Sequence, residues 1–211
     1  YDSERFNVLN INKIEVHLGG NRKTRDIVYA QLEDVNKNIF NVYVNHWPSR
    51  LGGQDKSEPL RIIAAKTLHN NILEIFTKDK NANIICLGDF NDEPDNISIA
   101  DILSAYKYEC KENIINEYSL INMSYFKFSK GEGTIKYQGK FNLIDQLIIS
   151  KGLFNRITSN DKCSLFSIYN PDWILTKEGN FKGAAIPTYG GKKYLGGYSD
   201  HLPITFEFSF E

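Results

Sequence analysis

Two short polar clusters in this sequence have residue types suited to metal and proton chemistry. Asp89 and Asn91, within the segment 88–94, come directly after an uninterrupted apolar run, and Asp200 and His201 come directly before a final alternating apolar run. Carboxylate and amide oxygens suit Mg²⁺, Mn²⁺ or Ca²⁺, and an imidazole can give or take a proton near neutral pH. The clusters therefore indicate a metal site with an acid–base group, although the same residue types also form surface turns and strand ends.

A third polar cluster lies around Trp47, which we interpret as a packing anchor. His46 can donate a proton to a leaving oxygen or hold a phosphate oxygen. The planar guanidinium group of Arg50 offers several N–H donors to the same anion. We interpret two other histidines, His17 and His69, as solvated or structural.

Strands and helices must bring these clusters together. The segments 26–32 and 38–44 contain β-branched and aromatic residues on either side of a polar turn, which predicts a hairpin. A cap at Ser57 and apolar residues at helical spacing predict a long helix reaching Phe76, and the run 84–87 predicts a strand buried on both faces. We also predict a short helix at 97–105, an irregular Gly/Tyr/Lys-rich loop at 187–198, and strands at 118–122, 133–136, 144–150, 163–166 and 204–208.

The composition is that of one folded domain spanning 1–211. The 211 residues carry a formal charge of −1 with a pI near 6.5, so a polyanionic partner must be held by a local patch or a bound cation. Three widely spaced cysteines predict structural thiols rather than a disulfide framework or a zinc site. The sequence contains no apolar stretch of membrane-spanning length and no recognisable leader, so the compartment stays open between secreted and cytoplasmic.

With these clusters identified, a resemblance to a known family becomes visible. The segments 45–50 (Asn-His-Trp-Pro-Ser-Arg), 88–91, 144–146 and 199–201 resemble, in order and spacing, the endonuclease/exonuclease/phosphatase superfamily. This superfamily includes deoxyribonuclease I, abasic-site endonucleases, neutral sphingomyelinases and inositol polyphosphate phosphatases. The resemblance implies a four-layer α/β/β/α sandwich of two mainly antiparallel mixed sheets flanked by helices, and it is strongest to bacterial members named only for the family.

The resemblance also implies a divalent-metal phosphodiesterase that works by in-line attack of water. Asp89 and Asn91 would orient the water, bind the scissile phosphate and contact the metal. His201 would act as the base or stabilise the pentacovalent phosphorane, with Asp145 orienting it, and the choice of base between Asp89 and His201 stays open. His46 would hold phosphate or serve as the general acid.

The remaining implied roles concern the metal, the phosphate and the loop before Asp145. Asp200 would be a metal ligand, with Mg²⁺ as the implied cofactor and Mn²⁺ or Ca²⁺ as alternatives. Asn45 and Arg50 would contact the substrate phosphate. Three residues are expected to shape the upstream loop: Thr134, Tyr137 and Gly139.

This sequence lacks two elements of the family pattern. Members begin with a strand ending in Asn and a Gln-Glu element whose Glu is the principal metal ligand, and the resemblance here begins after both. We therefore expect a fold incomplete at its N-terminus, with exposed sheet edge and apolar surface. We also expect weak or absent metal binding and hydrolysis by this chain alone.

Three functions stay open at this stage. The preferred one is a nuclease-like phosphodiesterase acting on DNA or RNA, which receives weak support from Lys182, Lys192 and Lys193 beside the Asp200 loop. The second is a phosphomonoesterase or a sphingomyelinase-type lipid phosphodiesterase. The third is a non-catalytic binder of a phosphate ligand or a protein, and no stable protein partner is evident from the sequence.

Overall fold

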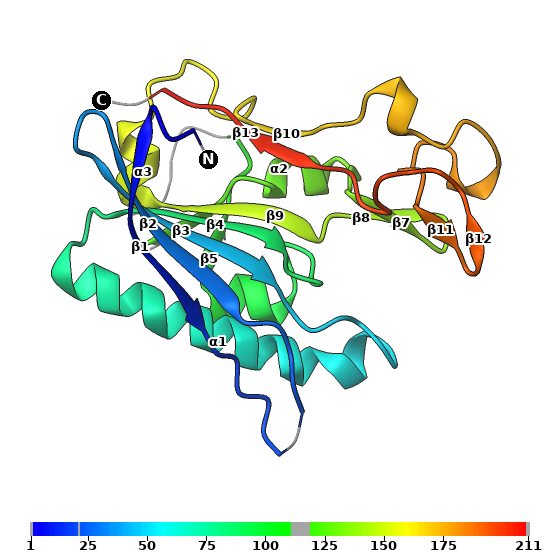
Figure 1. Cartoon of the computed structure of the whole chain (residues 1–211), viewed down its shortest axis with the longest axis horizontal. Coiled ribbons are helices and arrows are strands. Elements are labelled where there is room, and N and C mark those ends of the chain that lie inside the picture. Colours follow the sequence, from blue (N-terminus) through cyan, green and yellow to red (C-terminus); the bar gives the residue numbers. More distant parts are fainter. Residues whose placement is uncertain (1, 21, 111–118, 210–211) are drawn as a thin grey trace.

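A seven-stranded mixed sheet forms the centre of the protein, for which a computed structural model describes residues 2–20, 22–110 and 119–209 (Figure 1). Its strand order is β1-β2-β3-β4-β9-β6-β5, with β3–β4 and β5–β6 parallel and the other pairs antiparallel. The predicted hairpin is confirmed as β2 and β3. The strand predicted at 84–87 is confirmed within β4, but only one of its faces is fully buried: Ile84 and Cys86 are buried, whereas Ile85 and Leu87 are partly exposed. The strands are β1 (Phe6–Ile14), β2 (Ile27–Asp34), β3 (Ile39–His46), β4 (Asn83–Asp89), β5 (Ala105–Lys107), β6 (Leu120–Asn122) and β9 (Asp145–Ser150).

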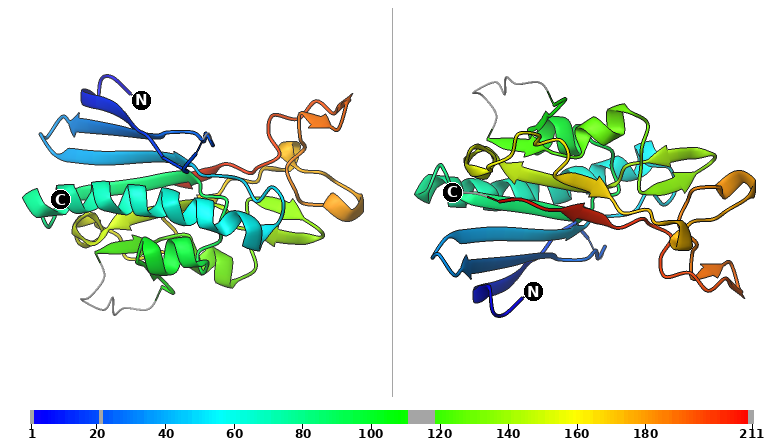
Figure 2. Two further views of the ribbon diagram at one scale, coloured as in Figure 1. Left: turned by 90° about the horizontal axis from the view of Figure 1, so that it is seen from below. Right: turned by 90° about the horizontal axis from the view of Figure 1, so that it is seen from above.

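The long helix α1 (Gln54–Lys78) covers one face of this sheet (Figures 1 and 2). Its buried side carries Ala64, Leu68 and Ile72 at helical spacing, and these pack into a core with strand residues. The predicted cap at Ser57 is wrong. Gly53 is the N-cap, and the Ser57 hydroxyl lies inside the first turn, where it donates to the Gly53 carbonyl at 2.7 Å.

The opposite face is covered by two antiparallel strands, β10 (Phe166–Ile168) and β13 (Ile204–Phe206), and by the short helices α2 (Tyr125–Ser129) and α3 (Lys151–Arg156). The β10–β13 ladder is the second sheet of the sandwich. Seen from above, β13 crosses the middle of the central sheet and leaves β1 and β2 to one side (Figure 2). On this side Ile11, Val28 and Val44 remain 61%, 43% and 44% exposed, as expected for a sandwich with an open end.

The elements not yet described are all short. The short helix predicted at 97–105 is a π-helical turn, Ser98–Ile102, and the strand predicted at 163–166 begins instead at Phe166. The prediction of an irregular loop at 187–198 is wrong, because it contains a hairpin of two-residue strands, β11 and β12. Tyr118, the first residue of another predicted strand, lies outside the described residues. The remaining elements are β7 (Ile135–Tyr137), β8 (Lys140–Asn142), β11 (Tyr189–Gly190), β12 (Lys193–Tyr194), and the 3-10 turns Asp172–Ile174 and Gly179–Phe181.

Two of the three cysteines form a disulfide, which corrects the prediction of free thiols. Cys110 and Cys163 are 53 residues apart in the sequence, and the fold brings their Cα atoms to 5.7 Å. Sequence spacing carries no signal for such a long-range pair. Cys86 is free and buried within β4, and burial raises the pKa of its thiol.

None of the helices in the described ranges is long and apolar enough to cross a membrane.

Candidate active site

Three polar side chains lie in one row across adjacent strand ends. His46 ends β3, Asp89 ends β4 and Asp145 begins β9. The strand register places His46 beside Asp89, and Asp89 beside Asp145. His46 Nε2 lies 3.4 Å from Asp89 Oδ2. The parallel and antiparallel pairings of β4 with its neighbours therefore gather at one edge three residues that are far apart in the sequence.

His201 joins this row through Asp145. Its Nδ1 lies 2.7 Å from Asp145 Oδ2, so with the proton on Nδ1 the imidazole donates to the carboxylate. The Leu202 N–H donates to the Thr134 carbonyl at 2.8 Å, which holds the segment before β13 against the loop before β7. The Thr134 hydroxyl also donates to Asp145 Oδ2 at 2.5 Å. Thr134 thus helps to orient the carboxylate, a role that the sequence analysis missed.

The charges in this cluster shift two pKa values. Burial raises the pKa of Asp89, and the neighbouring charge of Asp145 raises it further. Burial by itself would lower the pKa of His201. The hydrogen bond and the charge of Asp145, together with the charges of Asp89 and Asp200, outweigh burial, and the pKa of His201 is raised above its ordinary value. His201 therefore keeps its proton to a higher pH than a solvated histidine.

The substitution Asp145→Asn is expected to lower the pKa of His201 in the metal-free protein, because it removes the negative charge that opposes the effect of burial. An NMR titration of the His201 ring protons measures this shift. The ring-proton signals of the exposed His17 serve as the internal reference. An unchanged or raised pKa of His201 in this variant would show that Asp145 does not set its protonation.

The turn after β4 holds Asp89 and Asn91 together. The Asn91 backbone N–H donates to Asp89 Oδ1 at 2.7 Å, and the Asn91 side-chain amide donates to the Trp47 carbonyl at 3.0 Å and to Asp89 Oδ2 at 3.2 Å. Between them, Phe90 is buried and meets the buried Trp47 edge to face at 4.8 Å. The prediction that Trp47 is a packing anchor is confirmed, and Phe90 packs against it as a second anchor.

Gly88 makes this turn possible, because a Cβ at this position would lie 2.2 Å from the Asn45 carbonyl oxygen and its φ is +120°. The substitution Gly88→Ala is expected to lower the free energy of unfolding by more than about 1 kcal/mol, since both the backbone and the neighbouring strand must shift. Chemical denaturation measures the change. Gly52→Ala is the matched control, because Gly52 also has a positive φ (+87°) but open space around it. Equal losses in the two variants would show that the contact with Asn45 is not decisive.

Asn45 and Arg50, predicted to contact the phosphate, are both engaged with protein groups in this structure. Asn45 is buried, and its side chain accepts from Trp47 Nε1 at 2.9 Å. Arg50 Nε donates to the Asn91 carbonyl at 2.7 Å, and Arg50 lines a cavity of about 550 Å³ together with Asn91 and Tyr137. The structure thus supports a role for these two residues in holding the turn, and their contact with phosphate stays a prediction.

A buried ion pair lies behind the same turn and was missed by the sequence analysis. Arg61 of α1 and Asp92 are both fully buried, with Arg61 Nε 2.6 Å from Asp92 Oδ1. The Ser98 hydroxyl donates to Asp92 Oδ2 at 2.6 Å. The available signal was the position of Arg61 on the same helical face as Ala64 and Leu68, where an apolar residue is expected.

Asp200 lies at the surface next to His201. The oxygen donors of Asp89, Asn91 and Asp200 fit a hard divalent cation in chemical type. Within the ranges that the structure describes, no group of three or more His, Cys, Asp or Glu residues could hold a metal ion. The donors present here therefore fit one part of a cation site.

Solved structures with the same fold include proteins from three organisms. They are the human Nocturnin catalytic domain with bound sulfate (19% identity, TM-score 0.59), truncated TDP2 of Caenorhabditis elegans (16%, 0.61) and the mannosyl-6-phosphatase Bt3783 of Bacteroides thetaiotaomicron (13%, 0.59). The matches cover 99%, 99% and 100% of this chain, but only 62%, 68% and 69% of the three proteins. At these identities the likeness shows the fold.

The search of curated proteins found no match to this chain. A sequence model of the endonuclease/exonuclease/phosphatase family matches residues 1–209. The match includes all four segments on which the resemblance was based. This chain therefore belongs to the endonuclease/exonuclease/phosphatase family.

Proposed function

We propose that this chain carries the phosphate-binding and proton-transfer side of a phosphodiesterase that depends on a divalent metal. The observation that supports the proposal most directly is the row of His46, Asp89 and Asp145, with the His201 imidazole 2.7 Å from the last carboxylate. Members of the family are hydrolytic phosphoesterases. A module that only binds phosphate has no need for a carboxylate-oriented imidazole beside a second carboxylate.

The proposed reaction is in-line attack of water on a phosphodiester. Asp145 accepts from His201 Nδ1 and so fixes the ring, which leaves Nε2 to bind a phosphate oxygen or to take a proton. Asp89, held by the Asn91 backbone N–H, is the other candidate acceptor of the proton from water. His46 is about half exposed beside Asp89 and is placed to protonate the leaving oxygen. Negative charge that develops on the phosphate then meets fixed donors.

The proposal includes Mg²⁺ or Mn²⁺, held in part by Asp89, Asn91 and Asp200. When bound, the cation would stabilise negative charge on the phosphate oxygens. Burial and the neighbouring Asp145 already disfavour the charged form of Asp89, so this side of the row is suited to a compensating positive charge. We infer that further ligands complete the cation site, in line with the Glu that the family pattern implies.

The test is hydrolysis of bis(4-nitrophenyl) phosphate with Mg²⁺ or Mn²⁺. The assay compares this chain with a form extended by the natural upstream sequence where one precedes Tyr1. We expect weak or absent turnover by this chain and metal-dependent turnover by the extended form. Full Mg²⁺-dependent turnover by this chain alone would contradict the need for further ligands. Inactivity of both forms with every metal would favour a non-catalytic binder.

A panel of substrates then separates the remaining activities. A short DNA, a short RNA, sphingomyelin vesicles and a sugar phosphate represent the nuclease, lipid and phosphomonoesterase alternatives. We expect cleavage of a nucleic acid to be the fastest. Preferential hydrolysis of the sugar phosphate or the lipid would contradict the nuclease-like function. It would still agree with hydrolysis of a phosphoester.

A further inference from the structure

Exposed aromatic side chains are concentrated in residues 169–199, which lead from β10 to the segment that carries His201. We call these residues the aromatic loop. It projects beyond the central sheet at one end of the molecule (Figures 1 and 2). Seven aromatic side chains of the described ranges are exposed, and all except Tyr137 belong to this loop: Tyr169, Trp173, Phe181, Tyr189, Tyr194 and Tyr198. So many exposed rings in one place are typical of a surface that binds a partner.

The exposed rings lie on an ordered backbone. Trp173 and Tyr198 meet edge to face with centroids 5.7 Å apart, and Tyr189 and Tyr194 meet across the β11–β12 hairpin at 5.5 Å. Two backbone hydrogen bonds join the segments that carry these pairs, one from the Ile186 N–H to the Ile174 carbonyl (2.8 Å) and one from the Gly197 N–H to the Pro187 carbonyl (3.3 Å). The aromatic loop therefore presents its rings in a defined arrangement.

The residue types and their placement favour a lipid surface as the partner. All the exposed rings of the loop except Phe181 carry a polar N–H or O–H group. Trp and Tyr concentrate where lipid headgroups meet water, because such side chains are apolar at one end and hydrogen-bond at the other. The rings lie on two separate 3-10 turns and a hairpin. A protein partner must match such a surface in shape, whereas a bilayer can contact projecting side chains without a matching shape.

The charge of the aromatic loop indicates an anionic bilayer. The loop contains four Lys against one Asp and one Glu, a net charge of +2, although the whole chain has a net charge of −1. Lys177 pairs with Asp172 at 3.3 Å. Lys192 and Lys193 are exposed in the β11–β12 hairpin, beside its two tyrosines. Lysines at the surface of an anionic bilayer are attracted to its headgroups, and this attraction adds to the contacts of the rings.

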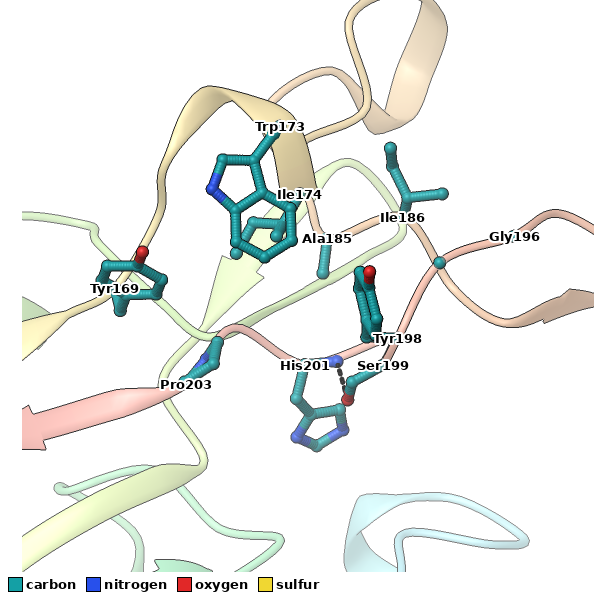
Figure 3. A pocket seen from close by; sticks show the side chains of 11 residues that line it. Tyr169, Trp173, Ile174, Ala185, Ile186, Gly196, Tyr198, Ser199, His201 and Pro203 are labelled. Atoms are coloured by element: carbon teal, nitrogen blue, oxygen red, sulfur yellow. Dashed lines mark hydrogen bonds between the residues drawn. The ribbon is translucent and has the colours of Figure 1, made fainter.

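The position of the rings leaves the candidate active site free. Figure 3 shows the rings of Trp173 and Tyr198 on one side of the segment that carries Ser199 and His201, and the His201 imidazole on the other side. The imidazole is held there by Asp145 at 2.7 Å. A surface that contacts the rings therefore does not have to cover the imidazole.

From these observations we infer that the aromatic loop docks the protein on the surface of an anionic lipid bilayer. The Trp and Tyr rings lie at the level of the headgroups, and Lys192 and Lys193 face the anionic groups. The inference goes beyond the proposed function, because it assigns a docking surface and does not depend on which phosphoester is hydrolysed.

The test measures binding to vesicles by sedimentation, without substrate or metal. Vesicles of phosphatidylcholine mixed with phosphatidylglycerol are compared with vesicles of phosphatidylcholine alone. We expect stronger binding to the mixed vesicles and a shift of tryptophan emission to shorter wavelength, because Trp173 is exposed and the other tryptophan, Trp47, is buried. Trp173→Ala should weaken binding by roughly tenfold. The double variant Lys192→Gln/Lys193→Gln should weaken binding to the mixed vesicles by roughly thirtyfold at low ionic strength.

The matched controls lie at the opposite end of the molecule, where α1 ends and where β2 turns into β3 (Figure 1). Val35→Ala removes an exposed apolar side chain from that turn, and Lys78→Gln/Lys80→Gln removes two exposed charges at the end of the helix. Both controls should bind vesicles as the parent protein does. No binding to the mixed vesicles, or equal losses in the loop variants and the controls, would overturn the inference.

Two further outcomes separate the docking surface from other readings. Binding of a short single-stranded DNA that Trp173→Ala weakens, in a protein that does not bind vesicles, would assign the rings to nucleic acid and overturn the inference. Vesicle binding by a protein that hydrolyses no phosphoester in its extended form would support the docking surface and reject the proposed function. Hydrolysis without vesicle binding would reject the docking surface alone.

Discussion

The substitution His201→Ala should lower kcat/KM for phosphodiester hydrolysis by about 10²- to 10⁴-fold in the active form of the protein. The reason is that the His201 imidazole is fixed by the partly buried carboxylate of Asp145, through a contact of 2.7 Å. Under the proposed mechanism, the substitution removes either the acceptor of the water proton or the positive group that faces the phosphate. Steady-state kinetics with bis(4-nitrophenyl) phosphate at saturating Mg²⁺ measures the effect.

His17→Ala is the matched control for this substitution. His17 is 82% exposed near Glu15, and it lies outside the strands that carry His46, Asp89 and Asp145. It should leave kcat/KM unchanged. His201→Ala should also keep the circular dichroism spectrum and the unfolding midpoint close to those of the parent, since the side chain is partly exposed. A loss of less than about fivefold would remove His201 from the catalytic group.

The substitution Arg61→Met should lower the free energy of unfolding by about 3–5 kcal/mol, because it removes the closest partner of the buried Asp92 charge and leaves Arg50 at the longer distance of 3.8 Å. Both side chains are fully buried, and Asp92 lies next to the turn that carries Asp89 and Asn91. Urea denaturation followed by fluorescence measures the loss. The pair also holds α1 to the end of β4, so the turn that carries Asp89 and Asn91 should become less ordered in the same variant.

Lys13→Met is the matched control, since Lys13 pairs with Asp26 at 3.5 Å but is 70% exposed. Its cost should stay below about 1 kcal/mol. If Arg61→Met fails to fold, the double variant Arg61→Met/Asp92→Asn decides the question, because it removes the uncompensated charge and should recover part of the stability. A double variant no more stable than Arg61→Met would show that the ion pair is not the source of the effect.

The sequence predicted the elements that have strong local patterns. The hairpin of β2 and β3, the helix α1 and the buried strand β4 follow from alternation, helical spacing and an apolar run. The start of α1 could not be predicted, because Ser57 has the composition of a cap but donates its hydroxyl backwards to Gly53. The hairpin at 189–194 was missed because strands of two residues are too short to show alternation.

The candidate site was predictable as a set of residues and less so as a geometry. The family resemblance named His46, Asp89, Asp145 and His201, whereas the row of the first three depends on the register of the strands β3, β4 and β9. Thr134 and Arg61 contribute through contacts whose partners lie 11 and 31 positions away, at Asp145 and Asp92. A single sequence has no local pattern for such contacts, because they form only when separate elements pack together.

The edge position of β1 has a consequence for handling the protein in solution. One row of backbone N–H and C=O groups on β1 faces outwards beside the exposed Ile11 and Val28, and such a row can align with the same strand of another molecule. The Asn and Lys side chains of β1 weaken this alignment without blocking it. We therefore expect the protein to self-associate reversibly at high concentration. Additional charged side chains on β1 would suppress this association better than substitutions that improve the packing of the core.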